Sequence, residues 1–348
     1  MSQADRKWNR LWRVVIFLCL AFTSYTVSRA EEKPKQAPAL TLIHVSDTHV
    51  CELDGLDSRF VEKRRHFGKG QEILKRFLNS FPRKAKADAV VITGDLVDFF
   101  ESQASNGAMQ SGQIDSFAKL VRSSPVPLWL TTGNHDLSSY WFEGADFLNG
   151  RHNVQMARSA WIRKIPSFEN GTWYSIVRRV GTTSYRLIFL ENGYQEGKVP
   201  GDLVDQTQLA WLNWQLSHGR ADTNILFMHV PLPVADTNGD GIRFNEPPAG
   251  WPFQDTYQNG LMKALNENPS IAAIIVGHQH RNVIEEMPFP AGHRITQIQT
   301  GNLQTDPTSW RVLRLTEDEI SVSAPGSVDP TAWKAPSRLS ARTVNIAP

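Results

Sequence analysis

The chain has 348 residues, and 41% of them are hydrophobic, which is enough for a substantial core in one large domain or two ordinary ones. The formal net charge is only +2, so no strongly basic surface points to a nucleic-acid partner. Length, composition and charge together indicate a soluble globular protein.

The first thirty residues differ from the rest of the chain. Four basic residues between positions 6 and 13 precede an apolar run at residues 14–22, and small and polar residues follow up to Ala30. This is the pattern of a secretory signal peptide cleaved after Ala30, so we expect a secreted or periplasmic protein. The alternative is an uncleaved anchor that tethers the protein to a membrane, although the apolar run is shorter than the ~20 residues that a spanning helix needs.

Removal of residues 1–30 changes the charge and the cysteine content of the chain. Five basic residues and one acidic residue are lost, so the formal charge falls from +2 to −2. Cys19 lies in the signal segment, and Cys51 is the only cysteine that remains. The exported protein therefore has no internal disulfide and must be stabilised in other ways.

Apolar runs of four to six residues end abruptly at polar clusters and predict buried strands at residues 40–45, 89–92, 126–130, 225–228 and 271–276. One-sided apolar patterns predict helices at residues 70–78 and 205–216. Further β-rich stretches, which make more strands than one sheet needs, lie at residues 172–180, 184–190, 294–299 and 310–315. We therefore predict an α/β fold, a four-layer αββα sandwich in which two mixed β-sheets are flanked by helices.

The segments that flank this pattern are polar or irregular. Residues 31–38 are predicted to form a linker, and residues 325–348 are predicted to form a loose tail because they are rich in Pro, Ser and Ala with little periodicity. The folded domain is then predicted to span residues 39–324.

Five clusters of polar residues directly follow predicted strands. They carry carboxylate, imidazole and amide groups, and they read Asp47-Thr48-His49, Gly94-Asp95-Leu96-Val97-Asp98, Gly133-Asn134-His135-Asp136, His229 and Gly277-His278-Gln279-His280. Any one of them alone could be an ordinary turn or a surface residue. Because open α/β folds place their sites at one edge of the sheet, all five would converge there, and together they predict a metal site.

These clusters resemble the motif set of the calcineurin-like metallophosphoesterases, which runs D-x-H, G-D-x-x-D, G-N-H-D/E, a lone His and G-H-x-H. The resemblance implies two bound divalent or trivalent metal ions. It assigns Asp47, His49 and His280 to the first ion, Asn134, His229 and His278 to the second, and Asp95 to a bridge between them. A shared carboxylate would offset the repulsion between two close cations. Nitrogen and oxygen ligands without a thiolate suit Mn, Fe, Zn or Co.

The resemblance also implies the reaction, which is attack of a hydroxide shared by the two ions on a small phosphate monoester or diester. His135 would face the substrate and either stabilise the phosphoryl oxygens or protonate the leaving oxygen. Asp136 is expected to accept a hydrogen bond from the other nitrogen of His135, and its alternative role is a loop cap. Purple acid phosphatases carry Tyr where this chain has Asp98, which we expect to accept a hydrogen bond from a ligand histidine.

Three alternatives stay open. The protein could be a catalytically inactive metal-binding scaffold of the same fold, although no ligand position is broken. Residues 236–241 begin like a calcium loop, but the closing Glu246 comes one residue early, so an acidic substrate loop is favoured. Arg59, Arg64 and Arg65 could reach a substrate phosphate or could form a solvated helix face.

Overall fold

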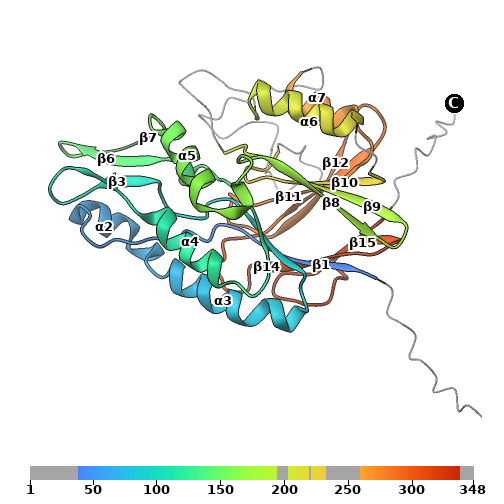
Figure 1. Ribbon diagram of the computed structural model, residues 1–348, viewed down its shortest axis with the longest axis horizontal. Coiled ribbons are helices and arrows are strands. Elements are labelled where there is room, and N and C mark those ends of the chain that lie inside the picture. The colour runs from blue at the N-terminus through green and yellow to red at the C-terminus, as the bar shows by residue number, and fades with distance from the viewer. Residues whose placement is uncertain (1–37, 194–202, 219–220, 233–258, 338–348) are drawn as a thin grey trace, which may run out of the picture. The chain divides into compact units, whose positions relative to one another are not determined.

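The computed structural model describes residues 38–193, 203–218, 221–232 and 259–337 (Figure 1). The predicted signal peptide, nearly all of the predicted linker and the calcium-loop candidate at residues 236–241 lie outside these ranges. Among the residues that the structure describes, no helix combines the length and the apolar character that crossing a membrane requires.

The first of two six-stranded sheets among the described residues runs in the order β16-β15-β14-β1-β2-β5. Strands β1, β2 and β5 are parallel, and the three others join them antiparallel. The bounds are β1 (Leu40–Val45), β2 (Ala89–Thr93), β5 (Leu128–Thr131), β14 (Trp310–Leu315), β15 (Glu319–Val322) and β16 (Trp333–Pro336). This sheet is therefore mixed, as predicted.

The second sheet runs in the order β12-β13-β11-β10-β9-β8. Its four central strands are parallel and its two edge strands are antiparallel. The bounds are β8 (Tyr174–Val180), β9 (Thr183–Phe189), β10 (Thr223–Phe227), β11 (Ile271–Val276), β12 (Val283–Pro288) and β13 (Arg294–Gln299). Central strands that are covered on both faces explain the continuous apolar runs in their sequences.

Helices cover the outer face of each sheet, so the predicted four-layer αββα sandwich is confirmed (Figure 1). The first sheet packs against α3 (Gly70–Ala85), α4 (Gln113–Ser123) and α5 (Val154–Lys164), and the second packs against α6 (Gln206–His218) and α7 (Gly260–Asn266). Short 3₁₀ turns lie at Arg65–Phe67, His135–Leu137 and Pro166–Phe168.

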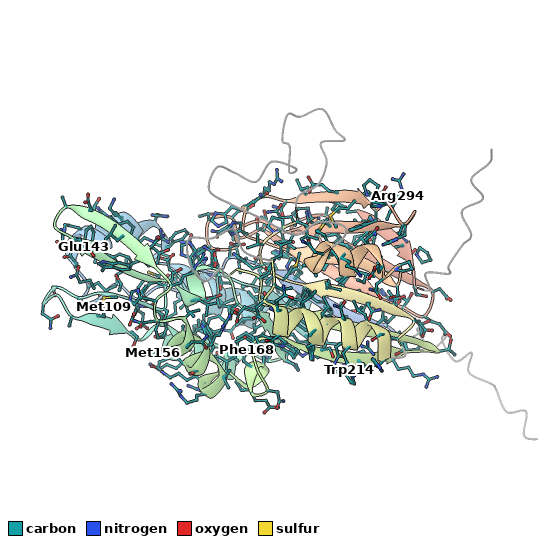
Figure 2. The ribbon with its side chains drawn as sticks, turned by 90° about the horizontal axis from the view of Figure 1, so that it is seen from above. Met109, Glu143, Met156, Phe168, Trp214 and Arg294 are labelled. Atoms are coloured by element: carbon teal, nitrogen blue, oxygen red, sulfur yellow. The ribbon has the colours of Figure 1, made fainter. Side chains whose placement is uncertain are left out.

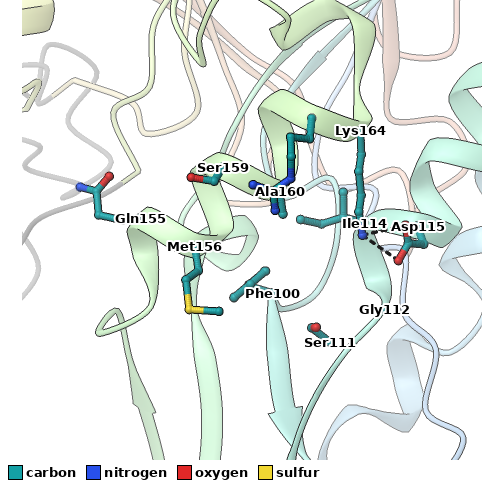
Figure 3. Close-up of a pocket in the computed structure, with 11 residues that line it drawn as sticks. Phe100, Ser111, Gly112, Ile114, Asp115, Gln155, Met156, Ser159, Ala160 and Lys164 are labelled. Atoms are coloured by element: carbon teal, nitrogen blue, oxygen red, sulfur yellow. Dashed lines mark hydrogen bonds and ion pairs between the residues drawn. The ribbon is translucent and has the colours of Figure 1, made fainter.

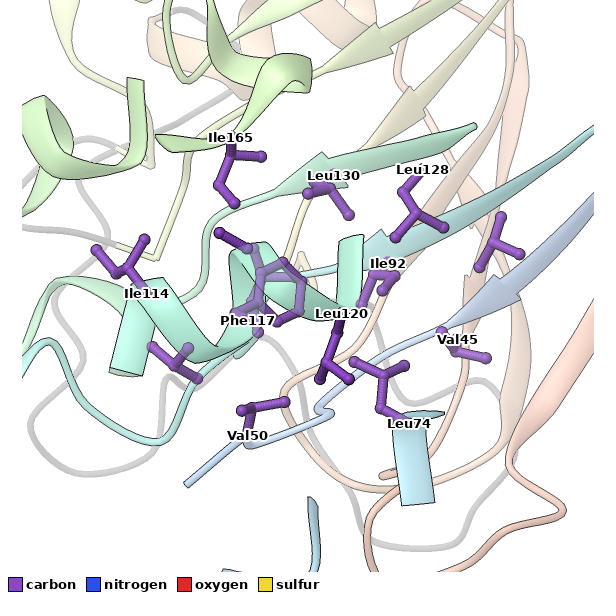
Figure 4. Close-up of a cluster of buried hydrophobic side chains, with 14 of the residues drawn as sticks. Val45, Val50, Leu74, Ile92, Ile114, Phe117, Leu120, Leu128, Leu130 and Ile165 are labelled. Carbon is purple, nitrogen blue, oxygen red and sulfur yellow. The ribbon is translucent and has the colours of Figure 1, made fainter. Parts of the chain in front are cut away.

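The side chains of β1 show how one strand serves two cores. Leu42 points between the sheets, whereas Ile43 and Val45 lie in the core under the helices, because successive residues of a strand face opposite sides. Figure 4 shows this second core, in which Leu74 and Phe117 from the helices meet side chains of the sheet. The buried cores hold the strand ends in place.

A third, four-stranded sheet was not predicted. It pairs β4 (Met109–Ser111), β3 (Glu101–Gln103), β6 (Ser139–Glu143) and β7 (Asp146–Gly150) in this order, and α2 (Ser58–Arg64) packs beside it on an aromatic cluster that includes Phe60 and Tyr140. Figure 2 shows Met109 and Glu143 at the outer end of this sheet. Its strands have only three to five residues and β4 is wholly exposed, and the aromatic run at residues 140–142 of β6 is too short to predict a strand by itself.

The prediction of a loose tail from residue 325 is wrong for part of that segment. Residues 333–336 form β16, which pairs antiparallel with β15, and Trp333 packs against the core between the sheets. The open edge of β15 offers backbone partners that no local pattern in a Pro-rich segment reveals. The folded domain therefore extends past residue 324.

Lowering the pH should destabilise the fold through His44. This side chain is buried on β1 between the hydroxyls of Thr93 and Thr300, 2.7 and 2.8 Å from its ring nitrogens. Burial, and then the charge of Arg311, lower the pKa of His44 from 6.5 to about 3. Between pH 6.5 and about pH 3, His44 is protonated in the unfolded chain but not in the folded protein. The free energy of unfolding therefore falls as the pH drops, by up to ~1.4 kcal/mol per pH unit.

Urea unfolding of the wild-type protein and the His44→Gln variant between pH 7 and pH 4 measures this contribution. The free energy of unfolding should fall less steeply with decreasing pH in the variant than in the wild type. Parallel curves would show that His44 does not supply the pH dependence.

Candidate metal centre

The carboxyl ends of five parallel strands bring the predicted ligands together. The first sheet supplies Asp47 and His49 after β1, Asp95 after β2 and Asn134 after β5, and the second sheet supplies His229 after β10 and His278 and His280 after β11. The centre thus lies where the ends of the two sheets meet.

Three groups of metal-binding size lie among the described residues, and the predicted ligands form two of them, while the third joins His135 to His49 and Asp95. In the first group, Asp47 Oδ1 lies 3.3 Å from His280 Nε2 and 3.9 Å from His49 Nε2. In the second group, His229 Nε2 lies 3.2 Å from both Asp95 Oδ2 and Asn134 Oδ1. His278 Nδ1 lies 3.1 Å from Asn134 Oδ1 and belongs to the second group as well.

Asp95 is the side chain that faces both groups. Its Oδ2 atom lies 3.7 Å from His49 Nε2 and 3.2 Å from His229 Nε2. Its other oxygen, Oδ1, accepts a hydrogen bond of 2.9 Å from the backbone N–H of His135. One carboxylate oxygen is therefore aimed between the two groups while the other is anchored.

The backbone of the site has an uncommon conformation. Five of the seven predicted ligands have positive φ angles, namely Asp47 (54°), His49 (39°), Asp95 (47°), His278 (74°) and His280 (54°). Such angles cost on the order of 1 kcal/mol for a residue other than glycine, and they persist only where the surroundings enforce them. Backbone hydrogen bonds do so here, since Asp47 N–H donates to Gly94 O (3.2 Å) and His49 N–H donates to Asp95 O (2.9 Å).

Glycines precede the ligands where the strand ends approach each other closely. A Cβ atom at Gly94, whose φ is +79°, would clash with the ring of His229, and one at Gly277 would overlap the side chains of Ser46 and Asp47. The glycines of the G-D and G-H pairs thus allow the two sheets to close around the ligands.

Hydrogen bonds fix the tautomers of two histidines. His49 Nδ1 lies 3.0 Å from Asp98 Oδ1, and His229 Nδ1 lies 2.8 Å from the carbonyl of Thr93. Because both partners accept, Nδ1 carries a proton in each ring, and Nε2 is the nitrogen that would be available to a metal ion. Asp98 therefore accepts a hydrogen bond from His49, a predicted metal ligand, as the sequence analysis expected.

Neighbouring charges shift the pKa values of the buried groups in the centre. Burial opposes ionisation of Asp95, but His229 and His135 hold its pKa well below the usual range. Burial lowers the pKa of His229, but Asp95 outweighs this effect and raises it to about 9. Burial, and then His229, lower the pKa of His278 to about 3. The buried carboxylates thus favour positive charge at the centre, which a cation would supply.

Two orphaned atoms test whether a metal ion fits. Asp47 Oδ1 and His49 Nε2 are buried, and neither has a hydrogen-bond partner among the described residues. Leaving such atoms unsatisfied costs ~1–3 kcal/mol each, and a cation would satisfy both at once. The mixed oxygen and nitrogen donors suit a divalent transition metal, so the residues present fit divalent metal ions.

The expectation that Asp136 orients His135 is wrong. The carboxylate of Asp136 is buried and accepts hydrogen bonds from the backbone N–H groups of Gly133 (2.6 Å), Val97 (2.9 Å) and Leu96 (3.2 Å). The 3₁₀ turn at His135–Leu137 directs these successive side chains to different sides, so His135 reaches the centre while Asp136 ties two ligand loops together. Its alternative role as a loop cap is the one that the structure supports.

The ring of His135 has other partners. Its Nδ1 atom lies 2.8 Å from the carbonyl oxygen of Asp98 and 3.2 Å from the hydroxyl of Tyr140. The ring lies edge-on to that of His49, with 4.9 Å between the centroids. Burial lowers the pKa of His135, although Asp95 opposes this effect. His135 is thus a neutral imidazole that donates from Nδ1 and adjoins the metal ligands.

A comparison with protein-family models identifies the family of the chain. The family model for calcineurin-like phosphoesterases matches residues 40–282, a range that contains all five clusters. The chain belongs to the calcineurin-like phosphoesterase family. Membership agrees with the resemblance that the motif set suggested.

Two solved structures share the fold. A dimetal phosphatase from Danio rerio is similar with a TM-score of 0.53 and 15% identity, and the match covers 87% of this chain and 100% of that one. A purple acid phosphatase from yellow lupin (Lupinus luteus) seeds has a TM-score of 0.50 and 13% identity, over 86% of this chain and 53% of that one. No curated protein matches the sequence.

Asn192 is a residue of the candidate site that the sequence analysis missed. Its Oδ1 atom accepts hydrogen bonds of 2.9 Å from the backbone N–H groups of both His229 and Val230, and its Nδ2 donates to the carbonyl of Val230 at 2.7 Å. The side chain thereby fixes the turn that carries His229. Its position just after the apolar strand β9 is the signal that could have revealed it.

A separate cavity of about 420 Å³ lies between α4 and α5 of this family member (Figure 3). An ion pair of 2.7 Å between Lys164 Nζ and Asp115 Oδ1 lies at its edge. The predicted metal ligands do not line it, and we assign it no part in the chemistry. Its lining consists of Phe100, Ser111, Gly112, Ile114, Asp115, Gln155, Met156, Ser159, Ala160, Arg163 and Lys164.

Removal of metal ions should destabilise the folded protein. A cation present at a hundred times its dissociation constant stabilises the fold by ~2.7 kcal/mol per ion, which corresponds to a Tm decrease of about 5–10 °C when it is withdrawn. Thermal unfolding with and without EDTA, followed by addition of excess Mn²⁺ or Zn²⁺, measures the effect. A Tm that is the same in all three samples would contradict a metal centre at the orphaned atoms of Asp47 and His49.

Proposed function

We propose that the protein is an exported phosphoesterase that binds two divalent or trivalent metal ions and hydrolyses a small phosphate monoester or diester. The observation that carries the proposal is Asp95 Oδ2, which lies 3.7 Å from one ligand group and 3.2 Å from the other and could serve both ions. Asp47, His49 and His280 would hold one ion, and Asn134, His229 and His278 the other. Mn, Fe, Zn and Co suit these ligands.

The chain's own residues prepare the site for phosphoryl chemistry. When bound, two cations would draw charge from the phosphoryl oxygens and lower the pKa of a water molecule between them, which makes hydroxide available near neutral pH. Asp98 holds the ring of His49 through Nδ1, and the carbonyl of Asp98 holds Nδ1 of His135. Nε2 of His135 would then have to take up a proton from solvent before it could give one to the leaving oxygen or donate to a phosphoryl oxygen.

An inactive metal-binding scaffold is the main alternative. Each predicted ligand position carries an oxygen or nitrogen donor in the described structure, and the ring of His135, which a pure scaffold would not need, adjoins the ligands. These features favour an enzyme.

Turnover by metal-loaded protein tests the proposal. The protein is stripped of metal, reloaded with Mn²⁺, Zn²⁺, Co²⁺ or Fe²⁺, and assayed with an aryl phosphate monoester, an aryl phosphodiester and cyclic nucleotides. We expect hydrolysis that depends on the added metal, and the panel identifies the ester class. Protein that binds two ions per chain yet hydrolyses nothing in the panel would support the scaffold instead.

Export and membrane attachment form a separate part of the proposal, because they depend on residues 1–30. N-terminal sequencing of exported protein should give a start at Glu31. A start at Met1 together with recovery in the membrane fraction would support the tethered form.

A further inference from the structure

Arg64 connects two parts of the candidate site that the sequence does not link. It lies in the last turn of α2, a helix that packs beside the third sheet rather than on the αββα sandwich. Its side chain is only 16% exposed, whereas that of the next residue, Arg65, is 67% exposed and pairs with Glu62 on the surface. The two arginines thus have opposite environments, and only Arg64 turns inward.

The guanidinium of Arg64 donates two hydrogen bonds to the buried carboxylate of Asp98. Arg64 Nε donates to Asp98 Oδ2 at 2.7 Å, and Nη2 donates to Asp98 Oδ1. The carboxylate of Asp98 has no exposed surface, and its Oδ1 also accepts from His49 Nδ1 at 3.0 Å. A two-point contact with a planar guanidinium fixes the plane of a carboxylate, which a single contact leaves free to rotate.

The same guanidinium also lies beside His135. Arg64 Nη2 is 3.5 Å from His135 Nδ1, whose proton is directed to the carbonyl of Asp98. The aromatic rings of Phe67 and Tyr140 flank the guanidinium, 4.8 and 5.8 Å from Cζ to the ring centroids. Phe67 in turn stacks on the ring of His49 at 4.2 Å. Arg64 therefore packs against the residues that contact the rings of His49 and His135.

We propose that Arg64 is a positioning residue of the metal centre, which holds the carboxylate of Asp98 in the plane that directs the Nε2 lone pair of His49 toward the metal site. The proposal rests on the proposed function, since it assigns the residue to the centre through which hydrolysis would occur. Because Arg64 Nε and Nη2 donate to Asp98, only Nη1 remains for contact with a substrate phosphate, and metal affinity distinguishes that role from positioning.

The test measures metal affinity, so it does not depend on turnover. Equilibrium dialysis with Zn²⁺ gives the dissociation constants of the wild type, Arg64→Gln, Asp98→Asn and the double variant, with Arg65→Gln as the matched control on the same helix. Loss of a residue that orients a metal-ligating histidine typically weakens binding about 10–100-fold, which we expect for Arg64→Gln and Asp98→Asn. Arg65→Gln should bind like the wild type.

The double variant distinguishes a positioning role from a general loss of structure. If Arg64 acts through Asp98, Arg64→Gln should weaken Zn²⁺ binding by less than about 2-fold in the Asp98→Asn background, where no carboxylate is left to orient. That background also protects folding, because the neutral amide needs no buried counter-charge. Losses that multiply in the double variant would overturn the proposal.

Two further outcomes separate the proposal from its competitors. Arg64→Ala should regain part of its Zn²⁺ affinity when guanidinium ion is added at millimolar concentration, a recovery that a merely misfolded variant would not show. Unchanged Zn²⁺ affinity in Arg64→Gln with a raised KM would instead make Arg64 a substrate contact and overturn the positioning role. Wild-type protein that binds Zn²⁺ tightly without hydrolysing any ester would contradict the proposed function. The Zn²⁺ affinities of the variants would still test the positioning role of Arg64.

Discussion

Asp95→Asn should reduce kcat/KM for an aryl phosphodiester by at least ~10³-fold, because the negative charge of Asp95 would supply several kcal/mol of stabilisation to bound metal ions and each 1.4 kcal/mol is a factor of ten. Asparagine has nearly the same size, and its Oδ1 can still accept from the backbone N–H of His135, as Asp95 Oδ1 does at 2.9 Å. The substitution therefore removes the negative charge with little change in packing. Metal analysis of the same sample should show fewer than two ions per chain.

The exposed Asp146 on β7 provides the matched control, since Asp146→Asn also removes one carboxylate charge but lies outside the ligand set. It should retain wild-type kcat/KM and metal content. Equal rates for Asp95→Asn and the wild type would show that hydrolysis does not use this centre, and the proposed function would then have to be given up.

His135→Gln should lower kcat by ~10²–10⁴-fold while leaving the metal content unchanged. The reason is that His135 adjoins the ligands but has its Nδ1 atom fixed by the carbonyl of Asp98, 2.8 Å away. The loss should be larger for an alkyl phosphate ester than for a 4-nitrophenyl ester, because an alkoxide needs a proton in order to leave and 4-nitrophenolate does not. Steady-state kinetics on both esters measures the difference.

The comparison of esters also decides between the two roles of His135. Equal losses on both substrates would assign the ring to the phosphoryl oxygens rather than to the leaving group. Loss of a metal ion from His135→Gln would contradict both roles and would place His135 among the ligands, a possibility that its grouping with His49 and Asp95 allows.

Much of the fold follows from local sequence. The stretches at residues 40–45, 271–276, 294–299 and 310–315 coincide with β1, β11, β13 and β14, because buried strands are rich in apolar and β-branched residues. The polar clusters then follow at the strand ends, and parallel strands carry them to one edge. This is why the predicted ligands could be found without a structure.

Other features depend on contacts between distant segments and leave no local trace. The third sheet pairs strands of only three to five residues, of which β4 is wholly exposed, and β16 is held by the free edge of β15. The role of Arg64 depends on where α2 packs, and Arg59, Arg64 and Arg65 look alike in the sequence. The sequence could not show that Asp136 points away from His135, because the direction of a side chain within a short 3₁₀ turn is set by the turn and not by the residue type.

The centre takes its ligands from both sheets, so bound ions would cross-link the two halves of the sandwich. Asp95 from the first sheet and His229 from the second lie 3.2 Å apart, and a shift of one sheet against the other would change this separation directly. Substitutions in the apolar layer between the sheets, such as Phe227→Leu, would then alter the spacing of the ions from a distance. Heating should release the ions and separate the sheets in the same step, so that catalysis ends when the sandwich opens.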